Sequence, residues 1–275
     1  MPSTNASTDG SILLLGAAAR RFGLGCLALI LFIAPVVARW PKAAKPAAAL
    51  EVLFIGNSFN YYYDLPKMVA ELAEAGGLRP LGFEQETPGG CTLEQHWKSG
   101  KALTLIRSRR WDYVVLQDQS QAPLLNRKSM NEYAQKFDAE IRKQGATTIL
   151  YMTWAPQNKP ADQAAISTAY ERLARDLQAR LAPVGNAWKM ALAADRKLVL
   201  HDGDQKHPNA TGTYLAACVF YATLYGKNPE GLPGGFVGLT NDEARRLQTI
   251  AWQSVQAAGA TDKATTPRSP GQSSK

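Results

Sequence analysis

The chain has 275 residues, of which 45% are hydrophobic and 20% charged, a balance typical of one globular domain with a sizeable core. Its formal net charge is +8, but the basic residues are scattered and no basic stripe is interleaved with aromatic residues. This pattern argues against nucleic-acid binding and leaves attraction to an acidic envelope surface open.

The two ends of the chain are predicted to lie outside the folded domain. Arg20-Arg21 precede an apolar run at 22–38 that ends on a small residue, which favours a signal peptide over residues 1–38. The run is marginal for a membrane span, which needs about 20 apolar residues, so an uncleaved anchor in the inner membrane is the alternative. Residues 39–49 are predicted to be a linker and 259–275 a disordered tail, because both are rich in Pro, Ala, Ser or Thr. We therefore expect an exported monomer, periplasmic or secreted, with its domain at 50–258.

Strand-like and helix-like segments alternate through that domain. Short apolar or β-branched runs predict strands at 50–55, 81–86, 112–116, 147–153 and 197–200. Amphipathic spacing predicts helices at 66–75, 93–108, 130–143, 161–181, 210–225 and 242–257, with Asn209 and Asn241 as caps of the last two. The alternation predicts an α/β fold, a three-layer α/β/α sandwich with a mostly parallel, flavodoxin-like central sheet.

Several candidate site residues follow predicted strands. They are Ser58, Gly89-Gly90, the 117–121 segment, Trp154 and His207. In a parallel sheet, ligands bind at the carboxyl ends of the strands, so these residues are expected to converge.

Ser58, His207 and Asp204 supply the three roles of serine-ester chemistry. Ser58 ends the segment Phe54-Ile55-Gly56-Asn57-Ser58, although a serine at this place could also be a simple helix N-cap. A neutral imidazole is the usual base for a serine hydroxyl, and Asp204, three residues before His207, can accept from its far nitrogen. Asp202 competes for that role. The alternative for the whole segment is a polar loop closed by a helix cap.

Acyl transfer also needs hydrogen-bond donors aimed at the developing oxyanion. Gly89 and Gly90 follow a predicted strand, and glycine lets a backbone N–H approach a ligand closely, although a tight turn explains them equally. Glutamine amides after the 112–116 strand are further donors.

The other histidines and the cysteines have less specific interpretations. His201 ends a short predicted strand and reads as structural, and His96 lies in a predicted helix with a surface or supporting role. Cys91 and Cys218 could form one disulfide after export, but Cys218 lies in an apolar helix where free cysteine is common. No Cys/His spacing predicts a metal site.

Together these residues resemble the SGNH (GDSL-like) hydrolase superfamily over roughly 50–257. The first block of that family, usually Gly-Asp-Ser, corresponds to Gly56-Asn57-Ser58, and its second block, an oxyanion-hole glycine, to Gly89 or Gly90. Its last block, Asp-x-x-His, matches Asp204 and His207. The match is nearest to a bacterial SGNH-like group with Gly-Asn-Ser and Asp-x-x-His-Pro blocks.

The third block departs from the family. It is normally Gly-x-Asn-Asp, with an asparagine that completes the oxyanion hole, and no asparagine closely follows the strand here. Gln119 is the expected stand-in, with Gln117 and Gln121 as alternatives.

The resemblance implies a serine ester hydrolase without metal or organic cofactor. Its substrates would be small carboxylic esters, including O-acetyl groups of carbohydrates, and the oxyanion would be held by Ser58, Gly90 or Gly89, and Gln119. Asn57 and Trp154 are expected to contact the substrate. Trp154 and Trp97, if near the site, could stack on a sugar, although such tryptophans are more often core or rim residues. The alternatives are a binding module of the cell envelope that has lost efficient turnover, or an acyltransferase with the same triad.

Overall fold

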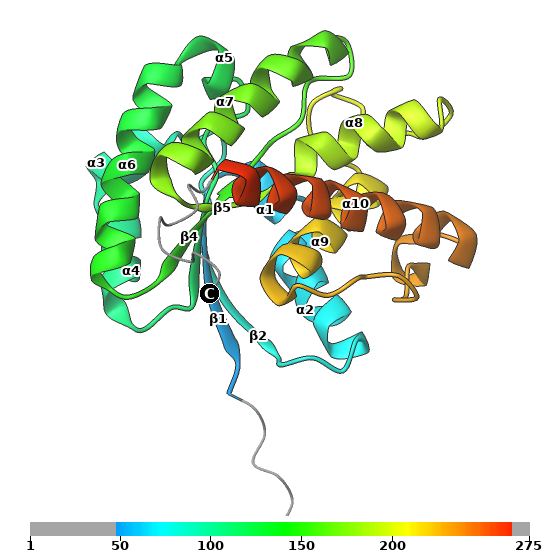
Figure 1. Cartoon of the computed structure of the whole chain (residues 1–275), viewed down its shortest axis with the longest axis horizontal. Coiled ribbons are helices and arrows are strands. Elements are labelled where there is room, and N and C mark those ends of the chain that lie inside the picture. Colours follow the sequence, from blue (N-terminus) through cyan, green and yellow to red (C-terminus); the bar gives the residue numbers. More distant parts are fainter. Residues whose placement is uncertain (1–47, 266–275) are drawn as a thin grey trace, which may run out of the picture. The chain divides into compact units, whose positions relative to one another are not determined.

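Figure 1 shows a computed structural model of the chain, which describes the backbone of residues 48–265 and the side chains up to residue 259. The predicted signal or anchor at 1–38 lies outside the described residues. So do most of the predicted linker at 39–49 and the end of the predicted tail, 266–275. Among the described residues, no helix is long and apolar enough to cross a membrane.

Five described strands form a parallel sheet in the order β2-β1-β3-β4-β5. They are β1 (Leu50–Ile55), β2 (Leu81–Glu86), β3 (Tyr113–Leu116), β4 (Thr147–Tyr151) and β5 (Arg180–Ala182). The predicted flavodoxin-like order is therefore confirmed. In the register, Ile55 lies between Glu86 and Leu116, so β2, β1 and β3 end side by side and the loops that follow them meet.

Helices cover both faces of the sheet because strand side chains alternate between two apolar cores. Val52 and Phe54 belong to one core, and Leu53 and Ile55 to the other. The first face carries α2 (Leu65–Ala75), α8 (Val184–Ala194), α9 (Ala210–Tyr225) and α10 (Asn241–Thr265) (Figure 1). The second carries α3 (Leu93–Ser99), α4 (Lys101–Ser108), α5 (Ala122–Leu125), α6 (Arg127–Lys143) and α7 (Gln163–Leu177). The short α1 (Ser58–Tyr61) follows β1. This is the predicted three-layer α/β/α sandwich.

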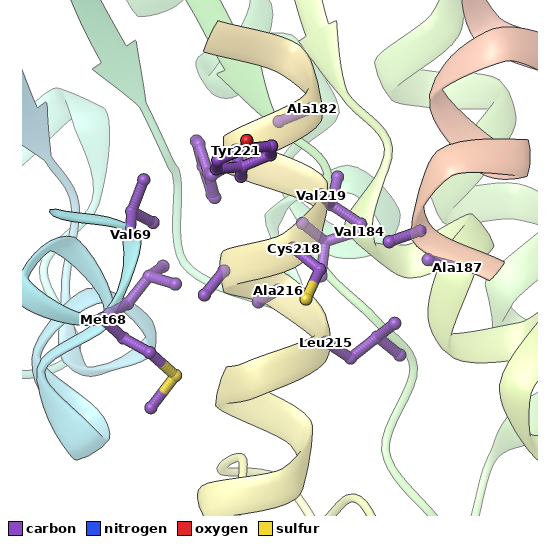
Figure 2. Close-up of a cluster of buried hydrophobic side chains, with 14 of the residues drawn as sticks. Met68, Val69, Ala182, Val184, Ala187, Leu215, Ala216, Cys218, Val219 and Tyr221 are labelled. Carbon is purple, nitrogen blue, oxygen red and sulfur yellow. The ribbon is translucent and has the colours of Figure 1, made fainter. Parts of the chain in front are cut away.

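Helix α9 is buried around its whole circumference. Every residue from 212 to 224 is buried, as expected for a helix that is apolar on all sides. Figure 2 shows α9 with Met68 and Val69 of α2 on one side and Val184, the first residue of α8, on the other. Asn209 caps its start, as predicted, by accepting from the Gly212 N–H at 2.9 Å. The core thus holds the chain firmly just after His207.

Two predicted helices are each interrupted in the structure. The helix predicted at 161–181 ends at Leu177, where Gln178 adopts a left-handed φ of 50°, and its last part is the edge strand β5. The helix predicted at 93–108 breaks at Gly100, whose φ of 74° ends α3 and begins α4. Both breaks occur where one residue adopts a left-handed conformation, which an amphipathic pattern does not register. Helix α8 was not predicted.

The predicted strand at 197–200 is wrong. That segment pairs with no strand, and the nearest pairing is an isolated antiparallel bridge between His201 and Pro208. Thr240 rather than Asn241 caps α10, since its hydroxyl accepts from the Glu243 N–H at 3.3 Å while the Glu243 carboxylate accepts from the Thr240 N–H at 2.9 Å. Helix α10 also continues past its predicted end, to Thr265.

Candidate active site

The turn after β1 presents the Ser58 hydroxyl at the start of α1. Asn57 has extended backbone and is the N-cap, because its side-chain oxygen accepts from the Phe59 N–H at 3.3 Å. Ser58 is the first residue of the helix, so interpreting Ser58 as a simple N-cap is wrong. Its own N–H belongs to the first helical turn, whose N–H groups have no acceptor within the helix.

Buried side chains fix this turn from below. The Gln117 carbonyl oxygen accepts from the Asn57 N–H and from the Asn60 amide, each at 2.9 Å. The His96 Nε2–H donates to the Gly56 carbonyl at 2.7 Å, which leaves its buried Nδ1 as the unprotonated nitrogen. His96 is 1% exposed, so of its two expected roles the surface position is wrong and the supporting role agrees with the structure. Burial lowers the pKa of His96, which keeps the ring neutral.

Gly56 is required because two side chains pack directly against its Cα atom, and not because of its backbone conformation. A Cβ atom on Gly56 would lie 2.2 Å from the Asn60 amide nitrogen and 2.5 Å from the Gln117 carbonyl oxygen. Real Cβ atoms do not tolerate such contacts, so the glycine lets the Gln117 and Asn60 side chains pack directly against the turn.

The structure brings Ser58, His207 and Asp204 together. The Ser58 Oγ lies 2.8 Å from the His207 Nε2, although the two residues are 149 positions apart. The Asp204 Oδ2 accepts from the His207 Nδ1–H, which makes Nε2 the free base that accepts from the serine hydroxyl. The sequence prediction that these three residues converge at the carboxyl end of the sheet agrees with this geometry.

Asp204 also accepts backbone hydrogen bonds within its own loop. Its Oδ1 accepts from the N–H groups of Lys206 at 3.0 Å and His207 at 2.9 Å. Burial alone would raise the pKa of Asp204, but the hydrogen bonds from the His207 ring and these N–H groups outweigh it and lower the pKa to about 2. The Asp202 carboxylate instead accepts from the Gly203 N–H at 2.8 Å, so Asp204 is the carboxylate that orients the imidazole.

A closed loop carries Asp204 and His207. It is bridged at its base by His201 and Pro208, and the Gln157 N–H donates to the Gln205 carbonyl at 2.9 Å. The Trp154 Nε1–H donates to the Lys206 carbonyl at 3.0 Å. These bonds hold the acid and the base at fixed positions relative to β4.

Trp154 therefore has a structural role, and its predicted contact with substrate is wrong. Its side chain is 1% exposed and its ring stacks between Phe59, at a centroid distance of 4.4 Å, and Trp188, at 4.0 Å. Trp97 likewise packs edge-on against Phe137. His201 has the predicted structural role, because its Nε2–H donates to the Ala155 carbonyl at 3.1 Å.

Two rings flank the His207 imidazole. The Tyr62 ring lies flat against it, with centroids 4.2 Å apart and planes at 10°, and Phe59 meets it edge-on at 5.6 Å. The sequence analysis did not single out Tyr62. The only available signal was its place in a run of three tyrosines four residues after Ser58, Tyr61 to Tyr63.

The glycine turn after β2 reaches the same site. The Cys91 N–H donates to the Pro88 carbonyl at 3.2 Å, and Gly90 adopts a φ of 67°, which only glycine adopts readily. The Asn57 side chain donates to the Cys91 carbonyl at 3.0 Å, which ties this turn to the serine. Asn57 is 2% exposed, so its predicted contact with substrate is wrong and it joins the two loops instead.

The glutamines after β3 differ in whether their amide N–H groups already have hydrogen-bond acceptors within the protein. The Gln117 amide donates to the Asp118 carbonyl, which removes it as an oxyanion donor. The Gln119 carbonyl oxygen accepts from the Gln121 N–H at 2.7 Å, and its amide nitrogen lies 3.5 Å from the Ser120 hydroxyl. Gln119 as the third donor stays a prediction, with Gln121 as the alternative.

Asp118 is a buried carboxyl beneath these loops. Its Oδ1 accepts from the Gln119 N–H at 2.6 Å and from the Leu93 N–H at 3.3 Å, so it joins the loop after β3 to the start of α3. Burial raises its pKa to about 6, against the opposing effect of these two hydrogen bonds.

Cys91 and Cys218 are both free thiols, and the disulfide considered from the sequence does not form. Cys218 is buried within α9, where burial raises its pKa to about 12. Among the described residues, no group of three or more His, Cys, Asp or Glu side chains is arranged to hold a metal ion.

The fold is that of the SGNH-like hydrolases. A DUF4886 family protein from Bacteroides uniformis superimposes with a TM-score of 0.68 at 20% identity, covering 76% of this chain and 95% of that one. A candidate SGNH hydrolase from Slackia heliotrinireducens gives 0.53 at 24% identity, covering 64% and 99%. A variant of an acetyl-xylooligosaccharide esterase from Geobacillus gives 0.52 at 15% identity, covering 66% and 96%. No protein-family model and no curated protein matches the chain.

Proposed function

We propose that the protein is a serine ester hydrolase with Ser58 as nucleophile, His207 as general base and Asp204 as orienting acid. The observation that carries the proposal is the 2.8 Å contact between the Ser58 Oγ and the His207 Nε2. A nucleophile within hydrogen-bond reach of a base, which is itself held by a third group, is the arrangement that activates a serine hydroxyl.

In the first half of the reaction, His207 takes the proton from Ser58 as the oxygen attacks the ester carbonyl carbon. The resulting oxyanion is held by the N–H groups of Ser58 and Gly90 (or Gly89), and by the amide of Gln119. Each such donor is worth about a hundredfold or more in rate. His207 then gives its proton to the leaving alcohol as the acyl C–O bond breaks, which leaves the acyl group on Ser58.

In the second half, water replaces the alcohol. His207 takes a proton from the water, the resulting hydroxide attacks the acyl carbon, and the proton returns to the Ser58 oxygen as the acid departs. The net reaction consumes one ester and one water and gives one acid and one alcohol.

The substrate class within this chemistry is proposed as carboxylic esters, including O-acetyl groups of carbohydrates. Support comes from the fold shared with an acetyl-xylooligosaccharide esterase. We also propose, from the sequence of residues 1–38, that the protein acts outside the cytoplasm. Fractionation of cells that express the full chain tests that location.

The test of the chemistry compares wild type with Ser58→Ala on short-chain aryl esters and acetylated sugars. The variant is expected to lose at least about 10⁴-fold in kcat while keeping its thermal unfolding transition. A serine-reactive phosphonate should label wild type at Ser58 and leave the variant unlabelled. Full turnover by Ser58→Ala would reject the proposal, and absence of both turnover and labelling in folded wild type would favour the binding module.

A further inference from the structure

A cleft of about 450 Å³ opens beside the His207 loop. It lies between the segment that joins α1 to α2, the start of α9 and the short helical turn η3 (Gly235–Val237). Its lining includes Tyr63, Asp64, Lys67, Glu71, Ala210 and Phe236. None of these residues has a part in the triad or among the proposed oxyanion donors.

Chain connectivity joins this cleft to the imidazole. Tyr63 directly follows Tyr62, whose ring stacks on His207. Ala210 begins α9 three residues after His207, and the Thr213 hydroxyl donates to the Tyr62 carbonyl at 3.5 Å. The proposed oxyanion donors come from Ser58 and from the loops after β2 and β3, and those two loops contribute nothing to the lining. The cleft is therefore lined by residues next in the chain to Tyr62 and close in the chain to His207, and by none from the loops after β2 and β3.

Two exposed aromatic rings, Tyr63 and Phe236, line the cleft together with the apolar side chains of Met68 and Val237. Tyr63 is 51% exposed and Phe236 is 46% exposed, which is unusual for large apolar side chains. Charged groups lie among them: the Asp64 carboxylate and the ion pair of Lys67 with Glu71, at 3.9 Å. A lipid chain needs a continuous apolar lining. Flat apolar rings surrounded by hydrogen-bonding groups instead match a saccharide, which has apolar C–H faces and a rim of hydroxyls.

The backbone at this point is strained. Tyr63 and Asp64 adopt φ values of 50° and 51°, and neither is a glycine. Side chains rarely adopt this left-handed conformation, and consecutive examples cost free energy that other contacts must supply. Such strain is concentrated at binding and catalytic sites, and here it sets the place of Tyr63 next to the ring that covers His207.

We infer that this cleft binds the alcohol side of the ester, and that this alcohol is a saccharide stacked on Tyr63 and Phe236. The inference rests on the proposed function. When the acyl C–O bond breaks, the proton on the His207 Nε2 passes to the sugar oxygen, so the leaving sugar must lie on the imidazole side. We place the cleft on that side because Tyr63 and Ala210 line it, whereas the acyl oxygen faces the proposed donors from Ser58 and the loops after β2 and β3.

The test measures steady-state kinetics on two substrates, an O-acetylated xylo-oligosaccharide and p-nitrophenyl acetate. Tyr63→Asn removes the ring while tolerating the left-handed backbone, Tyr63→Phe keeps the ring, and Phe236→Ala removes the second ring. Loss of one stacked ring is expected to raise KM for the oligosaccharide about tenfold with little change in kcat. Tyr63→Phe should behave as wild type, and all three should hydrolyse p-nitrophenyl acetate normally.

Val199→Ala is the matched control, since Val199 is 56% exposed and lies outside this cleft. Calorimetric binding of the deacetylated oligosaccharide to Ser58→Ala, with and without Phe236→Ala, gives a readout that does not depend on turnover. Equal effects on both substrates, or unchanged KM and unchanged binding in the ring variants, would overturn the inference while wild-type ester hydrolysis still stood. Turnover by Ser58→Ala would instead overturn the proposed function, and the binding measurement would still decide the cleft.

Discussion

The Tyr62 ring lies parallel to the His207 imidazole at a centroid distance of 4.2 Å. Asp204 fixes the ring of His207 at one edge and Tyr62 covers one of its faces, while Phe59 meets it edge-on. The base is therefore held by a hydrogen bond in its plane and by packing above it. Both restraints act on the direction in which Nε2 points.

Replacing Tyr62 tests the packing restraint. Tyr62→Leu removes the flat ring, so the imidazole gains freedom to rotate away from Ser58, and kcat for a small ester should fall about tenfold because productive geometry is populated less. Tyr62→Phe keeps the stacked ring and should retain nearly full activity. The comparison of kcat with KM is the measurement, and a larger loss in Tyr62→Phe than in Tyr62→Leu would contradict a packing role.

Asp204→Asn tests the hydrogen bond to the imidazole. The amide can donate to Nδ1, which favours the wrong tautomer, and kcat should fall by about 10³–10⁴ with little change in KM. Asp202→Asn is the matched control in the same loop and should leave kcat within about twofold, since its carboxylate bonds only to the backbone of its own turn. Equal losses in the two variants would remove Asp204 from its assigned role.

The low pKa of Asp204 predicts how activity depends on acid. Because its pKa is about 2, Asp204 stays ionised at pH 4, so its hydrogen bond to the His207 ring is kept at that pH and its own protonation limits activity only below it. The pKa of Asp204 is lower in the folded protein than in the unfolded chain, where it is about 3.9. The ionised carboxylate therefore stabilises the fold above about pH 3.9, and this stabilisation is lost as the pH falls toward 2. The unfolding free energies of wild type and Asp204→Asn, measured by chemical denaturation, should therefore converge only as the pH approaches about 2.

Asp118 should make the folded protein less stable as pH rises. Its pKa is raised to about 6 on folding, so the folded state binds the proton more tightly than the unfolded chain. The free energy of unfolding should fall between about pH 4 and pH 6, by at most ~3 kcal/mol, and stay low above that range. Asp118→Asn keeps an acceptor for the Gln119 N–H and cannot ionise. Urea denaturation from pH 4 to pH 8 should show this fall in wild type and a flatter profile in the variant, and parallel profiles would contradict it.

Gly56→Ala should disrupt both stability and activity. The added methyl group would lie 2.2 Å from the Asn60 amide, so the side chains that hold the Ser58 turn must move, at a cost of about 1–3 kcal/mol in unfolding free energy. Gly259→Ala is the matched control, since an added Cβ there meets nothing within 4 Å and alanine favours a helix. Thermal unfolding and ester turnover should change in the first variant alone.

Much of the fold could be predicted because its local signals agree with its tertiary packing. The β-branched run before Leu116 and the apolar run before Gly56 are buried on both faces, which makes a strand the consistent reading. Asn209 and Gly226 bracket α9 as expected. The edge strand β5 was not predicted, because its three residues, Arg180–Ala182, continue the pattern of the preceding helix. Only their pairing with β4 makes them a strand.

The meeting of Ser58, Asp204 and His207 could be predicted because each of these residues carries chemistry that few residues offer. The spacing of Asp204 and His207 alone places a carboxylate within reach of the ring. Trp154 and Asn57 were assigned to substrate from their places after strands, but exposure depends on neighbours such as Phe59 and Trp188 that no local pattern reveals. Tyr62 and Tyr63 could not be assigned to the site from the sequence either, because their position depends on a left-handed turn that contains no glycine.

The bridge between His201 and Pro208 closes a loop that already contains both the acid and the base. Ser58 is translated early and this loop late, and α9, which anchors the loop, comes later still. A growing polypeptide therefore carries Ser58 long before the imidazole that contacts its hydroxyl exists. In the proposed enzyme, turnover would then report a chain that is nearly complete.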